Sequence, residues 1–430
     1  MNELPVWYDG KKINEVLFAE AFLDSHPMAC IHGNFFTEAG RIGDESILEK
    51  EIYDMLRPYV QNGLAKKVEG LLGVLRTECY VSELPLQSDR IHVANGTYFL
   101  DGHFSEDKEL CRNRLPVEYS PDAPAPTAWL RFLNDLLAEE DVLTLQEFMG
   151  YCMLPTTKAQ KMIMIIGKGG EGKSRIGVVV RALFGDNMAN GNLAKVETNR
   201  FARADLENIL VMVDDDMQLE ALPQTNYIKM IVTADIPIDL ERKSKQSYQG
   251  ELYCRFLGFG NGSLKALYDR SEGFFRRQII LTAKPKRPDR VDDADLADSL
   301  IRERDSIFLW CLEGLHRLMG NHYHFTISDQ ARENMENAVS DGNNVVDFMR
   351  SEGYITLRAD AEVSSKELYL LYKLWCEDNA LNPLAARSFS GYLVENQRAY
   401  DLEYTNNIYI GGGRRVRGFV GIEAQQHVSI

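Results

Sequence analysis

One stretch of the chain, MIMIIGKGGEGKSRIGVVV at residues 162–180, constrains the fold more than any other. Five apolar residues, 162–166, lead directly into the glycine-rich run Gly167–Ser174, and a helix-compatible apolar segment follows. Short apolar runs alternate with helix-compatible segments from there to about residue 290, which is typical of an α/β core with a largely parallel sheet. The sequence therefore predicts a buried strand, a tight loop and a helix within such a core.

The run Gly167–Ser174 matches the pattern G-x-x-x-x-G-K-[ST] in full. Glycines let the backbone wrap with its N–H groups directed at phosphate oxygens, where a side chain would clash. Lys173 would place its ammonium group between the β- and γ-phosphates, and the Ser174 hydroxyl would hold Mg²⁺. A flexible loop that happens to carry lysines is the alternative. The residues expected to bind ATP and Mg²⁺ are Gly167, Gly169, Gly170, Gly172, Lys173 and Ser174.

A second apolar run, Ile209–Val213, leads straight into Asp214, Asp215 and Asp216. Three carboxylates at the C-terminal end of a strand repel one another unless a cation lies there. We expect Asp214 to hold Mg²⁺ through water and Asp215 to orient the attacking water, with Asp216 a rival for either role. An acidic turn without a catalytic role is the alternative.

Two further segments carry candidate catalytic residues. The apolar run in ELYCRFLGFGNGSL ends at Asn261, whose amide can bind the γ-phosphate or the attacking water, although Asn-Gly is also a common turn. Arg276 and Arg277 stand just before another apolar run, IIL. An arginine there can serve as a finger that reaches the phosphates of a neighbouring subunit. A solvated arginine pair is the alternative.

The distribution of charge indicates a confined contact surface. The formal net charge of −16 disfavours nucleic acid as a partner, but residues 241–290 hold twelve Lys and Arg against five Asp and Glu, a balance of +7. This basic segment predicts a groove or channel, or else a solvated charged face. Because the sequence shows no signal peptide, no membrane-spanning run and only scattered cysteines, we expect a cytoplasmic protein with reduced thiols and no membrane contact.

Composition divides the chain into three expected domains: a mixed α/β domain at 1–120, the loop-bearing core at 121–340 and a C-terminal domain at 341–430. The proline-rich segment YSPDAPAPTAW marks the first boundary, and a Gly-Asn-Asn break marks the second. A helix over 45–60 and a hairpin around Asn95-Gly96 are expected in the first domain, and one helical segment over 126–154 and one helix over 298–319 are expected in the second.

The last 90 residues follow the order of a winged-helix domain. A capping box at Ser364–Glu367 opens one predicted helix, and a second helix follows it. The end of the chain alternates apolar and polar residues around a glycine triplet, which predicts a two-stranded ribbon. Arg414, Arg415 and Arg417 at its tip can contact DNA, although many such modules mediate only protein contacts.

The order of these motifs resembles that of the superfamily-three helicases. The similarity is to the helicase part of phage and plasmid primase-helicases related to the poxvirus-type enzymes, and it is most specific over residues 145–285. The resemblance implies an AAA+-like P-loop core that forms a ring, usually a hexamer, and moves 3′ to 5′ along single-stranded DNA with ATP and Mg²⁺. It also implies that the DNA-contacting hairpin of the family lies between the acids and the asparagine. There the candidates are Arg242, Lys243, Lys245 and Tyr248.

The resemblance implies a DNA helicase that helps to replicate a phage, a plasmid or another mobile element, with replication-origin DNA as a further partner. Whether a separate primase joins it stays open. Two departures from the family stand out. All three acids are aspartates where many relatives carry a glutamate, and the residues before the core are too few for an archaeo-eukaryotic primase domain, so we expect no primer synthesis. The alternatives are an ATP-switched initiator or loader that binds DNA without unwinding it, and a P-loop kinase acting on a small molecule.

Overall fold

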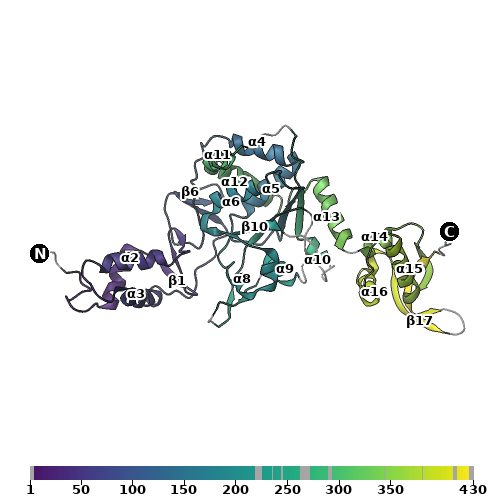
Figure 1. Ribbon diagram of the computed structural model, residues 1–430, viewed down its shortest axis with the longest axis horizontal. Coiled ribbons are helices and arrows are strands. Elements are labelled where there is room, and N and C mark those ends of the chain that lie inside the picture. Colours follow the sequence, from purple (N-terminus) through teal and green to yellow (C-terminus); the bar gives the residue numbers. More distant parts are fainter. Residues whose placement is uncertain are drawn as a thin grey trace. The chain divides into compact units, whose positions relative to one another are not determined.

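The computed structural model describes residues 4–217, 225–234, 236–243, 246–261, 272–288, 293–342, 344–379, 381–409 and 414–425, without the side chains of residues 272 and 339–342. The chain has a mixed α/β fold and divides into two compact units (Figure 1). The first unit contains residues 1–264 and 276–332, and the second contains residues 265–275 and 333–430.

The centre of the first unit is a five-stranded sheet in which all neighbouring strands are parallel. Its strands are, in spatial order, β14 (Gln278–Thr282), β8 (Met162–Ile166), β13 (Arg255–Gly260), β10 (Val211–Met217) and β9 (Met188–Asn190). Ile166 lies opposite both Gly260 and Thr282, so β8 and its two neighbours end at one edge of the sheet. The predicted largely parallel sheet and the predicted strand at 162–166 are confirmed.

Both faces of this sheet are buried, which explains why its strands are continuous apolar runs. Ile163 and Ile165 belong to a large core that includes Trp129 and Phe148, while Met162 and Met164 on the opposite face are fully buried as well. A parallel strand covered on both faces has no solvent side that would call for alternating polar residues.

Five helices of the first unit pack against one another beside this sheet (Figure 1). They are α4 (Thr127–Leu136), α5 (Glu139–Tyr151), α6 (Ser174–Phe184), α11 (Leu296–Arg302) and α12 (Arg304–Gly320). The sequence predicted one helical segment where α4 and α5 lie and one long helix where α11 and α12 lie. The second break falls at Glu303, whose carboxylate accepts hydrogen bonds from the backbone N–H groups of Ala128 and Trp129, both at 3.0 Å. Glu303 thereby satisfies orphan donors in the first turn of α4.

A smaller helical group packs with a hairpin near β13. It consists of α7 (Leu193–Thr198), α8 (Arg200–Ala204), α9 (Asn226–Thr233), β11 (Ile238–Leu240) and β12 (Tyr248–Gly250). The short 3₁₀ helix η1 (Gly185–Asn187), which precedes β9, packs against α6 and β7. β11 and β12 pair antiparallel, so a hairpin does form between the acidic strand and Asn261. The carboxylate of Glu197 accepts hydrogen bonds from the first backbone amides of α9, at Tyr227 and Ile228, which fixes the helix in place.

The N-terminal part of the first unit has an apolar core of its own. It contains α1 (Glu15–Ser25), α2 (Ser46–Leu56), α3 (Leu64–Glu78) and an antiparallel sheet of β1 (Ala29–Ile31), β2 (Asn34–Thr37) and β3 (Gly40–Arg41). Leu48, Ile52 and Leu56, one helical turn apart, are the buried residues of α2, so the helix predicted there is confirmed.

A second small sheet links this part to the central core. Its strands are β4 (Arg90–Val93), β5 (Gly96–Phe99), β6 (Phe104–Ser105) and β7 (Arg114–Leu115). The predicted hairpin is confirmed as β4–β5, but Ala94 and Asn95 form its loop, because Gly96 already pairs with Val93. A Cβ atom on Gly96 would lie 2.1 Å from the carbonyl oxygen of Ser105, so close packing against β6 requires glycine there. Ile91 and Leu115 belong to the central core, which therefore contains residues from both sides of the proline-rich segment.

The second unit combines helices with a three-stranded antiparallel sheet of order β15-β17-β16. Its elements are α10 (Glu272–Phe275), most of α13 (Asp329–Gly342), α14 (Asn344–Arg350), β15 (Ile355–Ser364), α15 (Ser365–Asp378), α16 (Ala386–Glu395), η2 (Gln397–Ala399), β16 (Glu403–Tyr409) and β17 (Arg415–Ala424). The Ser364 side chain caps α15 by accepting from the backbone N–H of Glu367 at 3.2 Å. The two predicted helices and the ribbon are present, and β15 is an additional strand that the sequence pattern did not indicate.

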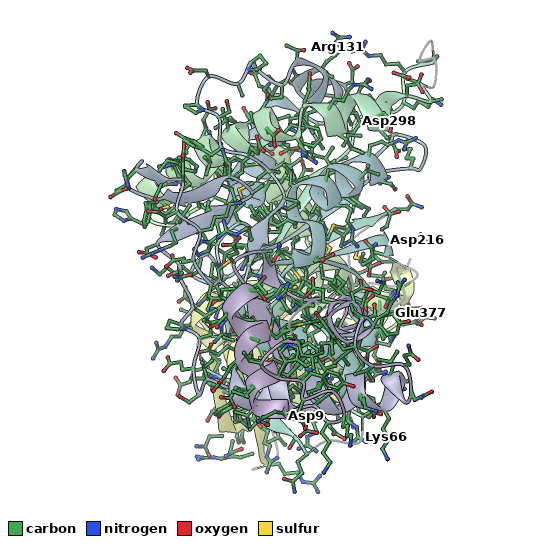
Figure 2. All side chains as sticks on the ribbon, turned by 90° about the vertical axis from the view of Figure 1, so that its left-hand side faces the viewer. Asp9, Lys66, Arg131, Asp216, Asp298 and Glu377 are labelled. Atoms are coloured by element: carbon green, nitrogen blue, oxygen red, sulfur yellow. The ribbon has the colours of Figure 1, made fainter. Side chains whose placement is uncertain are left out.

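Charged side chains cover the surface, as the exposed residues labelled in Figure 2 illustrate: Asp9, Lys66, Arg131, Asp216, Asp298 and Glu377. All seven cysteines are buried thiols. Of the helices in the described part of the chain, none combines the length and the sustained apolar character needed to cross a bilayer.

Candidate functional site

The glycine-rich loop joins the end of β8 to the start of α6 and has a backbone that glycine makes possible. Gly169, Gly170 and Gly172 have φ values of +99°, +82° and +101°, in the left-handed region that disfavours residues with a Cβ atom. A Cβ atom on Gly167 would lie 2.8 Å from the Nζ atom of Lys173. The first glycine therefore leaves room for the lysine side chain, and the other three turn the backbone.

The loop wraps around a carboxylate from its own sequence. Glu171 accepts hydrogen bonds from the backbone N–H groups of Lys168 at 2.5 Å and Gly169 at 3.0 Å, and from the Lys173 ammonium group at 2.7 Å. The side chains of Glu171 and Lys173 are only 3% and 9% exposed. Burial acts to raise the pKa of the Glu171 carboxyl, but the hydrogen bonds from Lys173 and the loop outweigh it and hold that pKa below its ordinary value. The loop thus binds an anionic group with its amides and its lysine.

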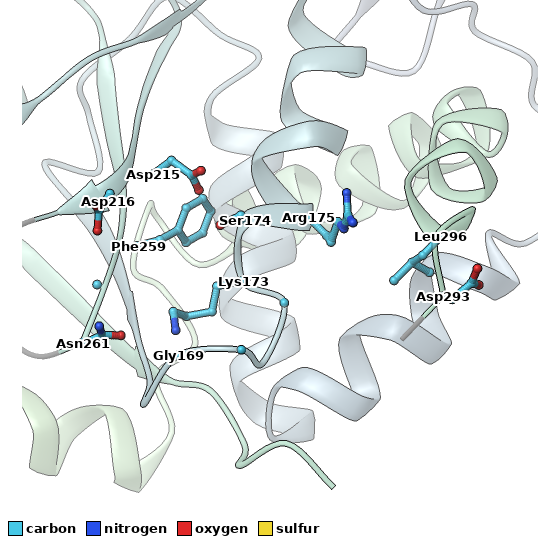
Figure 3. A pocket seen from close by; sticks show the side chains of 13 residues that line it. Gly169, Lys173, Ser174, Arg175, Asp215, Asp216, Phe259, Asn261, Asp293 and Leu296 are labelled. Carbon is cyan, nitrogen blue, oxygen red and sulfur yellow. The ribbon is translucent and has the colours of Figure 1, made fainter. Parts of the chain in front are cut away.

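A cavity of about 470 Å³ lies against this loop (Figure 3). Its lining residues are Gly169, Gly170, Gly172, Lys173, Ser174, Arg175, Asp215, Asp216, Phe259, Gly260, Asn261, Asp293 and Leu296. In Figure 3 one part of the cavity is bordered by the loop together with Asp215, Asp216 and Asn261. Asp293 and Leu296 lie across the cavity from them. The loop, the Asn261 amide and the carboxylates of Asp215 and Asp216 are separate motifs in the sequence, and they thus line the same cavity.

The strand order explains this meeting. β13 lies between β8 and β10, and Asn261 follows β13 directly, so the amide stands between the loop and the acids along one sheet edge. Parallel strands place their carboxyl ends at the same edge, which is the usual location of ligand sites in open α/β sheets.

The acids lie in the C-terminal part of β10, which continues one residue further to Met217, so their predicted place at the C-terminal end of a strand is confirmed. The register with β13 shifts between Asp214 and Met217, an irregularity of the kind that re-aims side chains near functional sites. Asp215 and Asp216 are exposed, whereas Asp214 is 3% exposed.

Asp214 makes a structural contact that the sequence did not indicate. Its Oδ2 atom accepts a hydrogen bond from the backbone N–H of Leu193 at 2.9 Å, at the start of α7. Burial raises the pKa of its carboxyl. Asp214 does not line the cavity of the loop. It borders a neighbouring cavity of about 830 Å³, where Ser174, Asp215, Asp216 and Arg304 also contribute to the lining.

Arg276 and Arg277 lie at the opposite end of the sheet from the loop. They precede β14, where the carbonyl oxygen of Arg277 accepts from the backbone N–H of Met162 at 2.8 Å. A five-residue strand spans about 17 Å, so neither arginine is close to the cavity of its own chain. Arg276 is exposed and Arg277 is half-buried.

The predicted DNA-contacting residues of the hairpin differ in their surroundings: two of them are bound to a buried carboxylate and one is exposed. Glu207, which is 4% exposed, accepts hydrogen bonds from Arg242 at 2.6 Å and from the Tyr248 hydroxyl at 2.7 Å. The Nδ1 atom of His32 lies 3.3 Å from the same carboxylate. Lys243 is exposed, and Lys245 lies outside the described residues. Arg242 and Tyr248 therefore anchor the hairpin to the body of the unit.

The arginines of the C-terminal ribbon are accessible. Arg414, Arg415 and Arg417 are all exposed, and Arg415 pairs across the ribbon with Tyr409. They belong to the second unit, whereas the residues that line the loop cavity belong to the first.

The residues of the loop cavity suit a magnesium nucleotide. Within the described residues, no cluster of three or more His, Cys, Asp or Glu side chains forms a metal site by itself. Protein-bound Mg²⁺ commonly combines one or two carboxylates with substrate phosphates and water, and the Ser174 hydroxyl with Asp215 or Asp216 supplies a partial ligand set of this kind. The carboxylate already bound by the loop shows that its amides and lysine accept an anion.

Several residues of the site carry no signal of their own in the sequence. Glu171 occupies a position at which the loop pattern permits any residue, and Arg175, Phe259, Asp293 and Leu296 join the cavity only through the fold. Glu207 is 35 residues from Arg242 in the sequence, and nothing in the local pattern links the two.

Comparison with known proteins gives a fold and no established function. The profile of a family described as "Family of unknown function (DUF5906)" matches residues 165–277, which include the loop, the acids and Asn261. No curated protein matches the chain. A solved structure described as "The apo structure of NrS-1 C terminal region (305-718)" aligns with a TM-score of 0.53 and 11% identity over 96% of this chain and 100% of that chain. A second, "The A form apo structure of NrS-1 C terminal region-CTR", aligns with a TM-score of 0.52 and 11% identity over 94% and 98%. The chain thus shares the fold of the NrS-1 C-terminal region over nearly its full length.

Proposed function

We propose that this chain is an ATP-dependent DNA helicase with an AAA+-like P-loop core, acting in the replication of a phage, a plasmid or another mobile element. The observation that carries the proposal is the single cavity in which the glycine-rich loop, Lys173 and Ser174 meet Asp215, Asp216 and Asn261. This set provides an anion cradle, a cation for the terminal phosphate and acids for the metal and the water.

The loop, the exposed acids and Asn261 each have a chemical task under this proposal. Lys173 neutralises charge on the terminal phosphate, and the loop amides bind phosphate oxygens. Mg²⁺ would be held by the Ser174 hydroxyl and through water by a carboxylate, and it would neutralise phosphate charge. Asp215 and Asp216 are exposed in the cavity, which supports a role for both in contacts with metal-bound and attacking water. Asn261 lines the same cavity, which supports a role for its amide in binding the γ-phosphate. Asp214, the first choice from the sequence for the metal, borders the neighbouring cavity and accepts a hydrogen bond from the backbone N–H of Leu193.

Two exposed sets of cationic residues are the candidates for contacts with DNA. We assign Lys243 at the hairpin tip to single-stranded DNA, and Arg414, Arg415 and Arg417 to the wing of a winged-helix domain that contacts duplex DNA. The distance of Arg276 and Arg277 from their own cavity supports a finger that acts on a neighbouring subunit of a ring, for which a hexamer is the expected size.

Unwinding of tailed duplexes tests the proposal. The full chain with ATP and Mg²⁺ should separate strands that carry a 3′ single-stranded tail, and its hydrolysis should rise when single-stranded DNA is added. If the protein is a monomer and its rate of ATP hydrolysis does not change when an oligonucleotide is added, the helicase is contradicted. A P-loop kinase is then the better hypothesis. The same assay with a 5′ tail checks the polarity.

One observation favours an ATP-switched initiator or loader as the second candidate. Arg242 and Tyr248 are bound to Glu207, so Lys243 is the one predicted hairpin contact that is exposed within the described residues, while all three ribbon arginines are exposed. An initiator would bind duplex DNA through the ribbon in an ATP-dependent manner and would fail to separate either tailed duplex.

A further inference from the structure

The carboxylate of Glu171 lies where a phosphate group of a nucleotide would find the same partners. Two loop amides and the Lys173 ammonium group donate to it, at 2.5, 3.0 and 2.7 Å. A lysine in this loop pattern serves to bind the terminal phosphates of a nucleotide. In this structure the ammonium group is instead paired with a buried carboxylate of the same loop.

The loop is shaped to accept this internal pair. Gly167 makes room for it, because a Cβ atom at that position would lie 2.8 Å from Lys173 Nζ and 2.9 Å from the Oε1 atom of Glu171. The carboxylate also stands two residues from the lysine along the chain, so it already lies beside the ammonium group when a nucleotide arrives. Two anionic groups that share one cation repel each other unless one of them moves away.

We propose that Glu171 is an internal counter-ion that competes with the nucleotide phosphates for Lys173 and must rotate out of the loop when a nucleotide binds. The inference rests on the proposed nucleotide site and adds a regulatory element to it. Glu171 weakens binding of the nucleotide, and it keeps the lysine and the loop amides satisfied until the phosphates replace it. The carboxylate thus makes the site selective for ligands with enough phosphate charge to displace it.

Equilibrium binding of a fluorescent ATP analogue with Mg²⁺ to the full chain tests the proposal without any measurement of turnover. Glu171→Gln keeps the size of the side chain and removes its charge, and Glu171→Ala removes the competitor entirely. Both variants should bind the analogue about tenfold more tightly than the wild type, a change that corresponds to about 1.4 kcal/mol. Glu139→Gln, which removes one exposed carboxylate on α5, is the matched control and should bind as the wild type does. Lys173→Ala should bind least.

The outcomes separate this inference from the proposed function. If the wild type binds the analogue and both Glu171 variants bind it equally well or less well, Glu171 only supports the loop and the inference is wrong. If neither the wild type nor any variant binds the analogue, the proposed nucleotide site itself fails. Thermal unfolding of each variant in the absence of nucleotide identifies any loss of affinity that comes from a disrupted fold. Tighter binding of Glu171→Ala can arise only in a folded protein, so that variant keeps the test decisive.

Discussion

The guanidinium group of Arg242 donates to the carboxylate of Glu207 at 2.6 Å, beneath the hairpin formed by β11 and β12. The same carboxylate accepts the hydroxyl of Tyr248 at 2.7 Å, so one buried residue holds both sides of the hairpin tip. The neighbouring Lys243 is exposed. Adjacent basic residues in the sequence therefore have different tasks, since one fixes the hairpin and the other is free to meet a ligand in solution.

Arg242→Ala is expected to lower the stability of the protein. It leaves the buried Glu207 carboxylate without its strongest partner, and a lost hydrogen bond to a charged group costs about 1.5–3 kcal/mol. Chemical denaturation should show this loss in the transition of the first unit. Lys243→Ala is the matched control and should change stability by less than about 0.5 kcal/mol. Equal stability of the two variants would contradict the anchoring role of Arg242.

Lys243→Ala is expected to weaken binding of single-stranded DNA and to reduce its dependence on salt. Each phosphate contact that is lost lowers the slope of log affinity against log salt by about 0.7 for single strands. Titration of a labelled oligonucleotide at several salt concentrations measures this slope. An unchanged slope would remove Lys243 from the DNA interface.

Lys173→Ala is expected to reduce ATP hydrolysis by at least about a hundredfold, because loss of a preorganised charge at a developing anion has effects of this size. Lys168 provides a control within the same loop, since its side chain is exposed and its contact to Glu171 uses only the backbone. Lys168→Ala should retain hydrolysis. Steady-state phosphate release compares the two variants, and comparable loss in both would show that the loop needs only general positive charge.

The sequence predicted the loop and its strand well because both are local. The eight residues from Gly167 to Ser174 are neighbours in the chain and in space, and the apolar run 162–166 has one natural place in a sheet buried on both faces. The acids were located in the correct strand for the same reason. Their separation into a buried Asp214 and exposed Asp215 and Asp216 depends on a register shift against β13, which no local pattern encodes.

Features that depend on distant contacts were missed. The helix break at Glu303 is stabilised by amides 174 and 175 residues away in α4, so hydrophobic spacing alone predicted one continuous helix. β9 has only three residues, and its sequence, Met-Ala-Asn, contains little strand preference. The anchoring of Arg242 by Glu207 likewise arises from the tertiary fold, which is why all basic residues of the hairpin were predicted to contact DNA.

Asp214→Asn is expected to make stability less dependent on pH. Burial raises the pKa of Asp214 above its ordinary value of 3.8, so the ionised carboxylate destabilises the folded state at neutral pH. The destabilisation is complete when the pH is above the raised pKa. It disappears as the pH falls through that pKa, because the carboxyl then takes up a proton more readily in the folded state than in the unfolded state. The amide oxygen of asparagine can still accept from Leu193. Without added metal, the unfolding midpoint of the variant relative to the wild type should be higher at pH 7.5 than at pH 4.5.

Asp215→Asn serves as the comparison, since Asp215 is exposed. Its midpoint relative to the wild type should change less between the two pH values than that of Asp214→Asn, because burial and not the Asp215 charge is the main cause of the raised pKa of Asp214. Its ATP hydrolysis should fall. If Asp214→Asn instead gains stability relative to the wild type as the pH is lowered, the buried carboxylate is not the origin of the pH dependence.

Arg276→Ala is expected to abolish ATP hydrolysis, and subunits that keep Arg276 should restore it. Arg276 is exposed at the opposite end of the sheet from its own cavity, so under the proposed function it would act on the nucleotide of a neighbouring subunit. Arg276→Ala subunits keep Lys173 and lack the finger, whereas Lys173→Ala subunits keep the finger and lack the lysine. An equal mixture of these two inactive proteins should recover hydrolysis at about a quarter of its sites if the subunits assemble at random in a head-to-tail ring. Phosphate release after co-incubation measures the recovery.

Arg277→Ala, which alters the half-buried neighbour, should be active without mixing. A mixture that stays inactive, with both variants folded and assembled, would show that Arg276 is not a finger acting between subunits.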